Sequence, residues 1–115
     1  MTNPINQLAN NAGEAIYSDP TFQRVLEINL PLLLNHPQVT RKAVQANIAY
    51  KNEGDFYGLL TDMAVQPKYW WLTLRLNGYT DPLKFDGNLD VLLMPPTGLV
   101  ELMRQRHVSG YGRLT

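Results

Sequence analysis

The hydrophobic positions of this chain follow a helical period most clearly in its second half. After a turn at residues 52–55, hydrophobic side chains recur at spacings of three and four. They are Phe56, Leu59, Leu60, Met63 and Ala64. Asp55 stands just before them, and aspartate is a favoured helix cap. The pattern predicts a helix that begins after Asp55, entered through a turn at Gly54.

A second helix is predicted directly after the first. Pro67 ends the first pattern, and proline suits the first turn of a new helix. Trp70 and Leu74 then share one face with Asn77, and Asn77–Gly78 is a typical helix end. Trp71 lies about 100° round the helix from Trp70. Either one tryptophan fills a core while the other lies at its boundary, or both cover one core from two sides.

Alternation with a period of two predicts strands on either side of these helices. Between Ala43 and Tyr50, one predicted face holds Val44, Ala46, Ile48 and Tyr50. Leu89–Met94 reads as a returning strand that stops at Pro95. Turns are predicted at Thr80–Pro82 and at Phe85–Gly87, where Gly87 follows an aspartate.

The flanking segments are hydrophobic but poorly periodic. A short helix is predicted over Pro4–Tyr17. The run Leu30–Leu34 contains Pro31, which removes a ladder donor, so we expect an edge strand or an extended arm there. At the other end we expect a short helix over Leu99–Arg106, capped by Thr97, and then a flexible tail.

These elements predict an α+β protein with three parts. Residues 1–42 form an N-terminal helix and extended arm, residues 43–96 a strand-helix-helix-strand module, and residues 97–115 a short helix with a flexible tail. Because such arms expose hydrophobic surface, we expect them to bury it on partner proteins.

Composition narrows the chemistry. Ten basic and ten acidic residues leave no net charge, and there is no cysteine. Bulk attraction to nucleic acid or an anionic membrane is therefore not expected, and neither is a disulfide scaffold or a thiolate metal site. No run approaches the ~20 apolar residues that span a bilayer, and the first residues lack a signal-peptide pattern, so we expect a soluble protein. No cofactor is expected.

No catalytic constellation is evident. Asp81, Asp86 and Asp90 are close in sequence, but aspartate before proline or glycine is common turn chemistry. His36 and His107 lack the spacing of a metal site. Arg104, Arg106 and Arg113 with Tyr111 are a weak signal for contact with nucleic acid, and contact with a neighbouring subunit is favoured. We therefore expect a protein that is not an enzyme.

Residues 52–95 resemble the lysin-motif (LysM) module, in which a strand leads through a Gly-Asp turn into two short helices and a strand returns beside the first. The residues that carry this resemblance are Gly54, Asp55, Leu59, Leu60, Asn77, Gly87, Leu89, Val91, Leu93 and Pro95. A narrower resemblance is to the LysM-like segment of baseplate wedge proteins of contractile-tailed bacteriophages. It is carried by Tyr57, Leu60, Pro67, Tyr69, Trp70, Trp71, Asn77, Asp81 and Pro82.

The resemblance implies a structural protein of the tail baseplate, assembled in the host cytoplasm and located in the virion, with wedge, hub or tube proteins as partners. Candidate interface residues are Tyr69, Trp70, Trp71, Asn77, Tyr79, Asp81, Pro82, Leu30, Leu32, Leu33, Arg104, Arg106 and Tyr111. The alternative is a module that binds N-acetylglucosamine in peptidoglycan. Such a module should expose a polar groove between the Gly54–Asp55 turn and residues 77–81.

Overall fold

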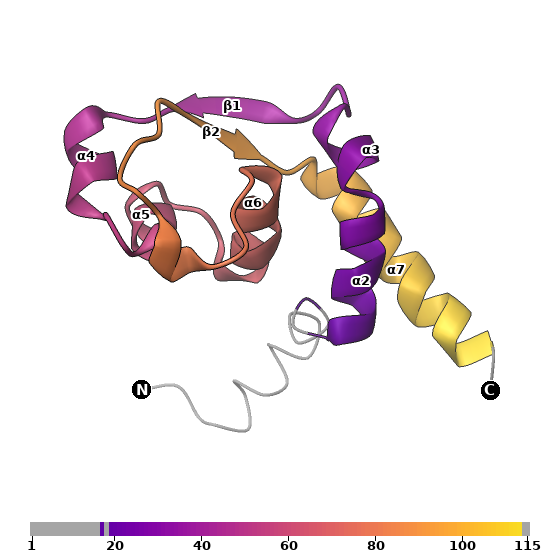
Figure 1. Ribbon diagram of the computed structural model, residues 1–115. Coiled ribbons are helices and arrows are strands. Elements are labelled where there is room, and N and C mark those ends of the chain that lie inside the picture. Colours follow the sequence, from indigo (N-terminus) through magenta and orange to yellow (C-terminus); the bar gives the residue numbers. More distant parts are fainter. Residues whose placement is uncertain (1–16, 18, 114–115) are drawn as a thin grey trace, which may run out of the picture.

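The computed structural model describes residue 17 and residues 19–113, with side chains to residue 107. Its helices and its two-stranded antiparallel sheet confirm the predicted α+β class (Figure 1). The helix predicted over Pro4–Tyr17 lies outside the described residues, except for Tyr17, which is buried.

The N-terminal flank is helical rather than extended. Helix α2 spans Pro20–Ile28, and the Asp19 carboxylate caps it by accepting from the Thr21 N–H at 3.0 Å. Helix α3 follows over Leu30–Leu34, so the edge strand or arm predicted there is wrong. Pro31 lies in the first turn of α3, where a backbone N–H has no partner within the helix, and its missing donor therefore costs little.

The predicted first strand is also misplaced. Strand β1 spans Thr40–Ala43, and residues 46–51 form helix α4, Ala46–Lys51. Ala49 is buried while Tyr50 is exposed, which contradicts the predicted alternation. Four alternating positions are too few to separate a strand from a short helix that buries one alanine. Three α-helices, rather than two, therefore lie between the strands.

The rest of the module follows the predicted order. Helix α5 spans Phe56–Asp62, and helix α6 spans Trp70–Leu76 after the 3-10 helix η2, Pro67–Tyr69. A further 3-10 helix, η3, spans Pro82–Lys84 before strand β2, Val91–Met94. The strands pair in antiparallel register, with Thr40 opposite Met94 and Ala43 opposite Val91.

The turn and cap residues act as the sequence indicates. Asp55 accepts from the Gly58 N–H at 2.9 Å at the start of α5. Gly54, Gly78 and Gly87 all have positive φ, a conformation that favours glycine. After α6, Gly78 donates to the Arg75 carbonyl and Tyr79 to that of Leu74, which completes a Schellman cap.

The C-terminal segment is one long helix. Helix α7 spans Thr97–Arg113, so the flexible tail predicted from residue 107 is wrong as far as Arg113. Glycines at positions 110 and 112 lower helix propensity without forbidding a helix. The α7 helix lies beside α2 (Figure 1). The rings of Phe22 and His107 make contact between the two helices, with centroids 5.2 Å apart.

A single hydrophobic core joins the module to both flanks. Most of the large, fully buried side chains come from α2, α3, α5, α6, β2 and α7. They include Phe22, Leu26, Leu33, Phe56, Leu59, Leu60, Leu72, Leu74, Leu92 and Val100. The flanks therefore bury much of their hydrophobic surface within this chain.

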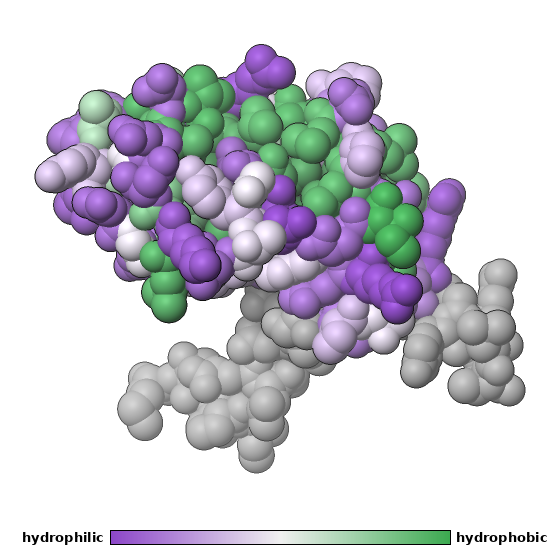
Figure 2. All heavy atoms as spheres, in the orientation of Figure 1, coloured by the Kyte–Doolittle hydropathy of each residue, from purple (hydrophilic) through white to green (hydrophobic). Residues whose placement is uncertain are grey.

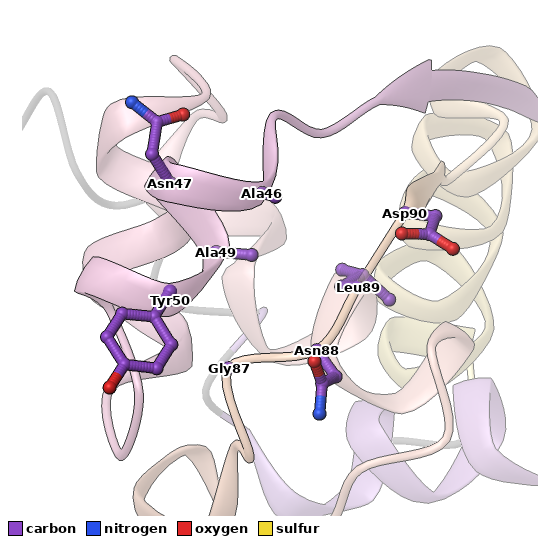
Figure 3. A pocket seen from close by; sticks show the side chains of 8 residues that line it. All are labelled: Ala46, Asn47, Ala49, Tyr50, Gly87, Asn88, Leu89 and Asp90. Carbon is purple, nitrogen blue, oxygen red and sulfur yellow. The ribbon is translucent and has the colours of Figure 1, made fainter.

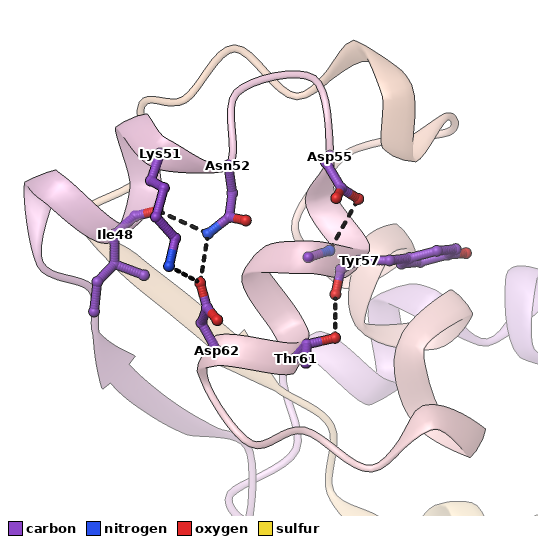
Figure 4. A network of polar contacts seen from close by, with 8 residues as sticks. Ile48, Lys51, Asn52, Asp55, Tyr57, Thr61 and Asp62 are labelled. Carbon is purple, nitrogen blue, oxygen red and sulfur yellow. Dashed lines mark hydrogen bonds and ion pairs between the residues drawn. The ribbon is translucent and has the colours of Figure 1, made fainter.

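Polar contacts fix α4 against α5 (Figure 4). The Asn52 amide donates to the Ile48 carbonyl and to the Asp62 carboxylate, both at 2.9 Å, and Lys51 pairs with Asp62 at 3.0 Å. The bond from Asn52 and the charge of Lys51 lower the pKa of Asp62. The network thus ends α4 and holds it to the C-terminal end of α5.

Candidate functional site

The two adjacent tryptophans have different surroundings. Trp70 stacks on Tyr57 of α5, with ring centroids 5.3 Å apart, and its indole N–H donates to the Val65 carbonyl at 2.8 Å. Both rings are partly buried. Burial, with a smaller contribution from the nearby Asp81 carboxylate, raises the pKa of Tyr57. Trp70 is therefore held in place by a stack on its ring and a hydrogen bond from its N–H.

Trp71 is less constrained. It is half-buried against the core, yet its indole N–H has no hydrogen-bond partner among the described residues and is not enclosed. Residues four apart share a helix face, which places Trp71 on the side of α6 that carries Arg75. Arg75 forms an ion pair with Glu27 of α2. Neither tryptophan is fully buried. Of the three consecutive aromatic residues Tyr69, Trp70 and Trp71, only Tyr69 is buried.

Asn77 joins the end of α6 to β2. Its carboxamide nitrogen donates to the carbonyls of Thr73 at 2.7 Å and Leu93 at 3.0 Å, and its oxygen accepts from the Leu93 N–H at 2.9 Å. The Asn77 side chain is thus committed to the fold and is not available to a partner.

The turn at Asp81–Pro82 is well ordered by its own contacts. The Asp81 carboxylate accepts from the Leu83 N–H at 2.9 Å, and Asp86 accepts from the Asn88 N–H at the same distance. Turn chemistry therefore occupies both carboxylates, as their sequence context indicates. Asp81 and Pro82 are half-exposed and lie close to Tyr57.

Aromatic rings fill the space where a polar groove would be expected. Phe56, Tyr79 and Phe85 contact one another between the Gly54 turn and the segment after α6, with centroids 5.2 to 5.6 Å apart. The Gly54 N–H also donates to the Phe85 carbonyl at 2.7 Å. These contacts hold the two segments together through packed aromatic rings, with ring edges and faces rather than polar groups between them.

A hollow of about 390 Å³ lies elsewhere, between α4 and residues 87–90. Ala49 and Leu89 point toward one another across it, whereas the polar side chains of Asn47 and Asp90 point away (Figure 3). Its floor is formed by small and hydrophobic residues. It lacks the converging polar groups that orient a small ligand.

A cluster of polar side chains centres on Glu101 of α7. Its carboxylate accepts from the Tyr17 and Tyr69 hydroxyls at 2.7 and 2.6 Å, and from Arg104 at 2.9 Å, and it pairs with Lys68 at 3.2 Å. Burial opposes ionisation, but these four donors outweigh it and lower the pKa of Glu101 to about 2. Burial and Glu101 together raise the pKa of Tyr17 and of Tyr69.

The cluster ties both flanks to the module. Tyr17 precedes α2, Lys68 and Tyr69 lie in η2, and Glu101 and Arg104 lie on α7. Every donor is satisfied by one ionised carboxylate, which is the arrangement of a structural clamp. Arg104, a predicted interface residue, is held within this clamp.

The remaining predicted interface residues fall into different environments. Leu33 is fully buried and Tyr69 is nearly so. Neither side chain can therefore contact a partner directly. Leu32 and Arg106 are exposed, and Leu30 and Tyr79 are half-buried. The side chain of Tyr111 lies outside the described residues.

The sequence pattern does not indicate that several hydrophobic residues are exposed. Tyr50 is 74% exposed, Leu83 72% and Ile28 69%. Figure 2 shows hydrophobic residues gathered on the face of the molecule that carries the sheet and α3. The alternating pattern places Tyr50 on a buried strand face, and Leu83 has no periodic pattern to mark it.

Comparisons with known proteins do not extend this picture. No protein-family model, curated protein or solved structure matches the chain. Within the described part of the chain, no helix is long and apolar enough to cross a membrane, and no three acidic or histidine side chains gather as a metal site would need.

Proposed function

We propose that this protein is a non-enzymatic structural component of a phage contractile-tail baseplate, in a wedge or hub-proximal position. It docks neighbouring tail proteins through the α+β module. It is assembled in the host cytoplasm and resides in the virion. Its partners are wedge, hub or tube subunits.

The observation that carries this proposal is the contrast between the two tryptophans. Trp70 has a stacking partner and a hydrogen bond, whereas Trp71 keeps an accessible N–H on a large, half-buried ring. A ring of this kind that is polar at one edge anchors protein interfaces efficiently. Exposed Leu32 and Ile28 add hydrophobic surface on the neighbouring helices.

Glycan binding has less support. The space between the Gly54 turn and the segment after α6 is filled by Phe56, Tyr79 and Phe85. The hollow beside α4 has a floor of alanine and leucine, and its polar side chains diverge. A sugar site needs polar groups that converge on the ring hydroxyls.

Two assays run side by side test the proposal. The protein is co-expressed with candidate tail proteins and analysed by size-exclusion chromatography. The purified chain is also sedimented with insoluble peptidoglycan. The proposal predicts co-elution with a tail protein and no retention on peptidoglycan. Retention on peptidoglycan without any stable protein complex would instead assign the protein to glycan binding.

A further inference from the structure

The sheet has one closed edge and one open edge. Strand β2 lies between β1 and the Asn77 side chain, which bonds both the N–H and the carbonyl of Leu93. Strand β1 has a paired strand on one side only, and among the described elements it packs extensively only against β2 (Figure 1). All four residues of β1 are exposed.

The register identifies the backbone groups on the open edge. In an antiparallel pair, residues alternate between facing the partner strand and facing away. The Val44 N–H donates to the Asp90 carbonyl at 2.9 Å, so position 44 faces β2. Thr40 and Lys42 share that orientation, and the N–H and carbonyl groups of Arg41 and Ala43 therefore point outward.

The side chains around this edge are basic and hydrophobic. Arg41 has no ion pair among the described residues, whereas Lys42 donates to the Met63 carbonyl at 3.0 Å. On the face that Arg41 and Ala43 share, the opposing residues of β2 are Leu93, which is half-buried, and Val91, which is 43% exposed. A strand added here would find free backbone groups, hydrophobic neighbours and an unpaired cation.

Charge decides between possible occupants. A second copy would bring another Arg41 and Lys42 to the same edge, and like charges on neighbouring strands are destabilising. Lysine and arginine on an edge strand also discourage random pairing of strands. An extended segment that carries a glutamate or aspartate opposite Arg41 would gain an ion pair there.

We propose that the outer edge of β1 accepts an extended, acidic segment of a partner protein as a third strand of the sheet. This mode of recognition takes its affinity from backbone hydrogen bonds and its selectivity from alternate side chains. The inference rests on the proposed docking function and names the chemistry of one contact. It is independent of the tryptophan face on α6.

The test uses the full-length, isotope-labelled protein and two capped heptapeptides, one of alternating valine and glutamate and the other with lysine in place of glutamate. The acidic peptide should shift the amide signals of Arg41 and Ala43 and slow their exchange with solvent. It should bind roughly fivefold more tightly than the lysine peptide, because it replaces a like-charge pair with an opposite-charge pair.

Two variants separate strand addition from general electrostatic attraction. Ala43→Pro removes one outward N–H while leaving the inward donors of Lys42 and Val44, so peptide binding should be lost. Ala43→Val keeps that N–H and should bind as the parent does. Arg41→Glu should reverse the preference toward the lysine peptide, and this variant needs no proline in the strand.

The following results would overturn the inference. One is the absence of any shift at Arg41 and Ala43 at millimolar peptide, and another is equal binding of both peptides. A dimer detected by sedimentation and abolished by Ala43→Pro would assign the edge to a second copy. If a complex with a tail protein survives Ala43→Pro, the edge proposal fails while the docking function stands. If the acidic peptide binds but no tail protein does, the edge proposal stands and the proposed docking function fails.

Discussion

The carboxamide of Asn77 pairs with the backbone of Leu93 in both directions, as a neighbouring strand would. The Asn77 oxygen accepts from the Leu93 N–H at 2.9 Å, and the Asn77 nitrogen donates to the Leu93 carbonyl at 3.0 Å. The N–H and carbonyl of Leu93 point away from β1, so that strand does not satisfy these two groups. One side chain at the end of α6 therefore completes the sheet and fixes the helix against it.

Asn77→Ala should destabilise the protein by about 2 to 3 kcal/mol, since it leaves the N–H and carbonyl of Leu93 without partners. Chemical denaturation measures the change, and hydrogen exchange should become faster at Leu93. Asn88→Ala is the matched control, because Asn88 is exposed and its side chain has no hydrogen bond among the described residues. Equal stability of both variants would contradict the role given to Asn77.

Exchanging alanine and glycine at the ends of α5 and α6 should change the stability of the protein in opposite directions. Ala64 has φ of 60°, a left-handed conformation that is strained for alanine, whereas Gly78 has φ of 89° at the equivalent position after α6. Ala64→Gly should stabilise the protein by about 1 kcal/mol, and Gly78→Ala should destabilise it by a similar amount. A Cβ at Gly78 would meet no atom within 4 Å, so only backbone strain is tested there.

Thermal or urea unfolding of the two variants provides the measurement. The midpoints should move in opposite directions from that of the parent protein. A destabilised Ala64→Gly variant would show that the strain at this helix end is offset by contacts of the alanine methyl group.

Because the pKa of Glu101 is lowered, we expect the free energy of unfolding to fall at acidic pH. Its pKa is about 2 in the folded protein, against an ordinary value of 4.5. A lowered pKa stabilises the folded state above pH 4.5, and this stabilisation is lost as the pH falls from 4.5 toward 2. Because the side chain keeps some contact with solvent, the contribution is on the order of 1 to 3 kcal/mol.

Glu101→Gln should therefore be less stable than the parent at neutral pH and should lose less stability between pH 4.5 and pH 2. Urea unfolding at a series of pH values checks this. Glu53→Gln is the control, because Glu53 is exposed and has no ion pair among the described residues. If Glu101→Gln keeps the acid dependence of the parent, the clamp has no electrostatic role.

Trp70→Ala should cost about 2 to 3 kcal/mol of stability, less than the loss for a fully buried tryptophan. The substitution removes the stack on Tyr57 and leaves the Val65 carbonyl without the indole donor. Thermal unfolding followed by circular dichroism measures the loss. A change no larger than that of an exposed residue would show that the stack contributes little to the fold.

The turns and helix caps of the module could be predicted from sequence because each depends on residues that are close together in the chain. Asp55 caps α5, Pro67 begins the turn before α6, and Gly78 ends it, each through bonds within a few residues. The end of strand β2 at Met94 is predicted for the same reason, since Pro95 limits it, although the strand begins at Val91 rather than at the predicted Leu89.

The errors arose where tertiary packing decides the structure. Residues 46–51 alternate like a strand, but α4 forms because Ala49 packs into the core and Asn52 reaches Asp62. The poor periodicity of the hydrophobic flanks predicts arms that bury on partner proteins, yet Leu33 and Val100 lie in the core of this chain. The donors of the Glu101 clamp lie up to 84 residues from Glu101 in the chain, and no sequence spacing marks such a set.

The central claim is that Trp71 faces a partner protein. The most direct measurement is the affinity of the Trp71→Ala variant for the tail protein captured by co-expression, with circular dichroism as the check on folding. We expect at least a roughly tenfold loss of affinity with an unchanged spectrum, as for an interface anchor that contributes more than about 1.4 kcal/mol. Unchanged affinity would contradict it and place the docking surface elsewhere on the molecule.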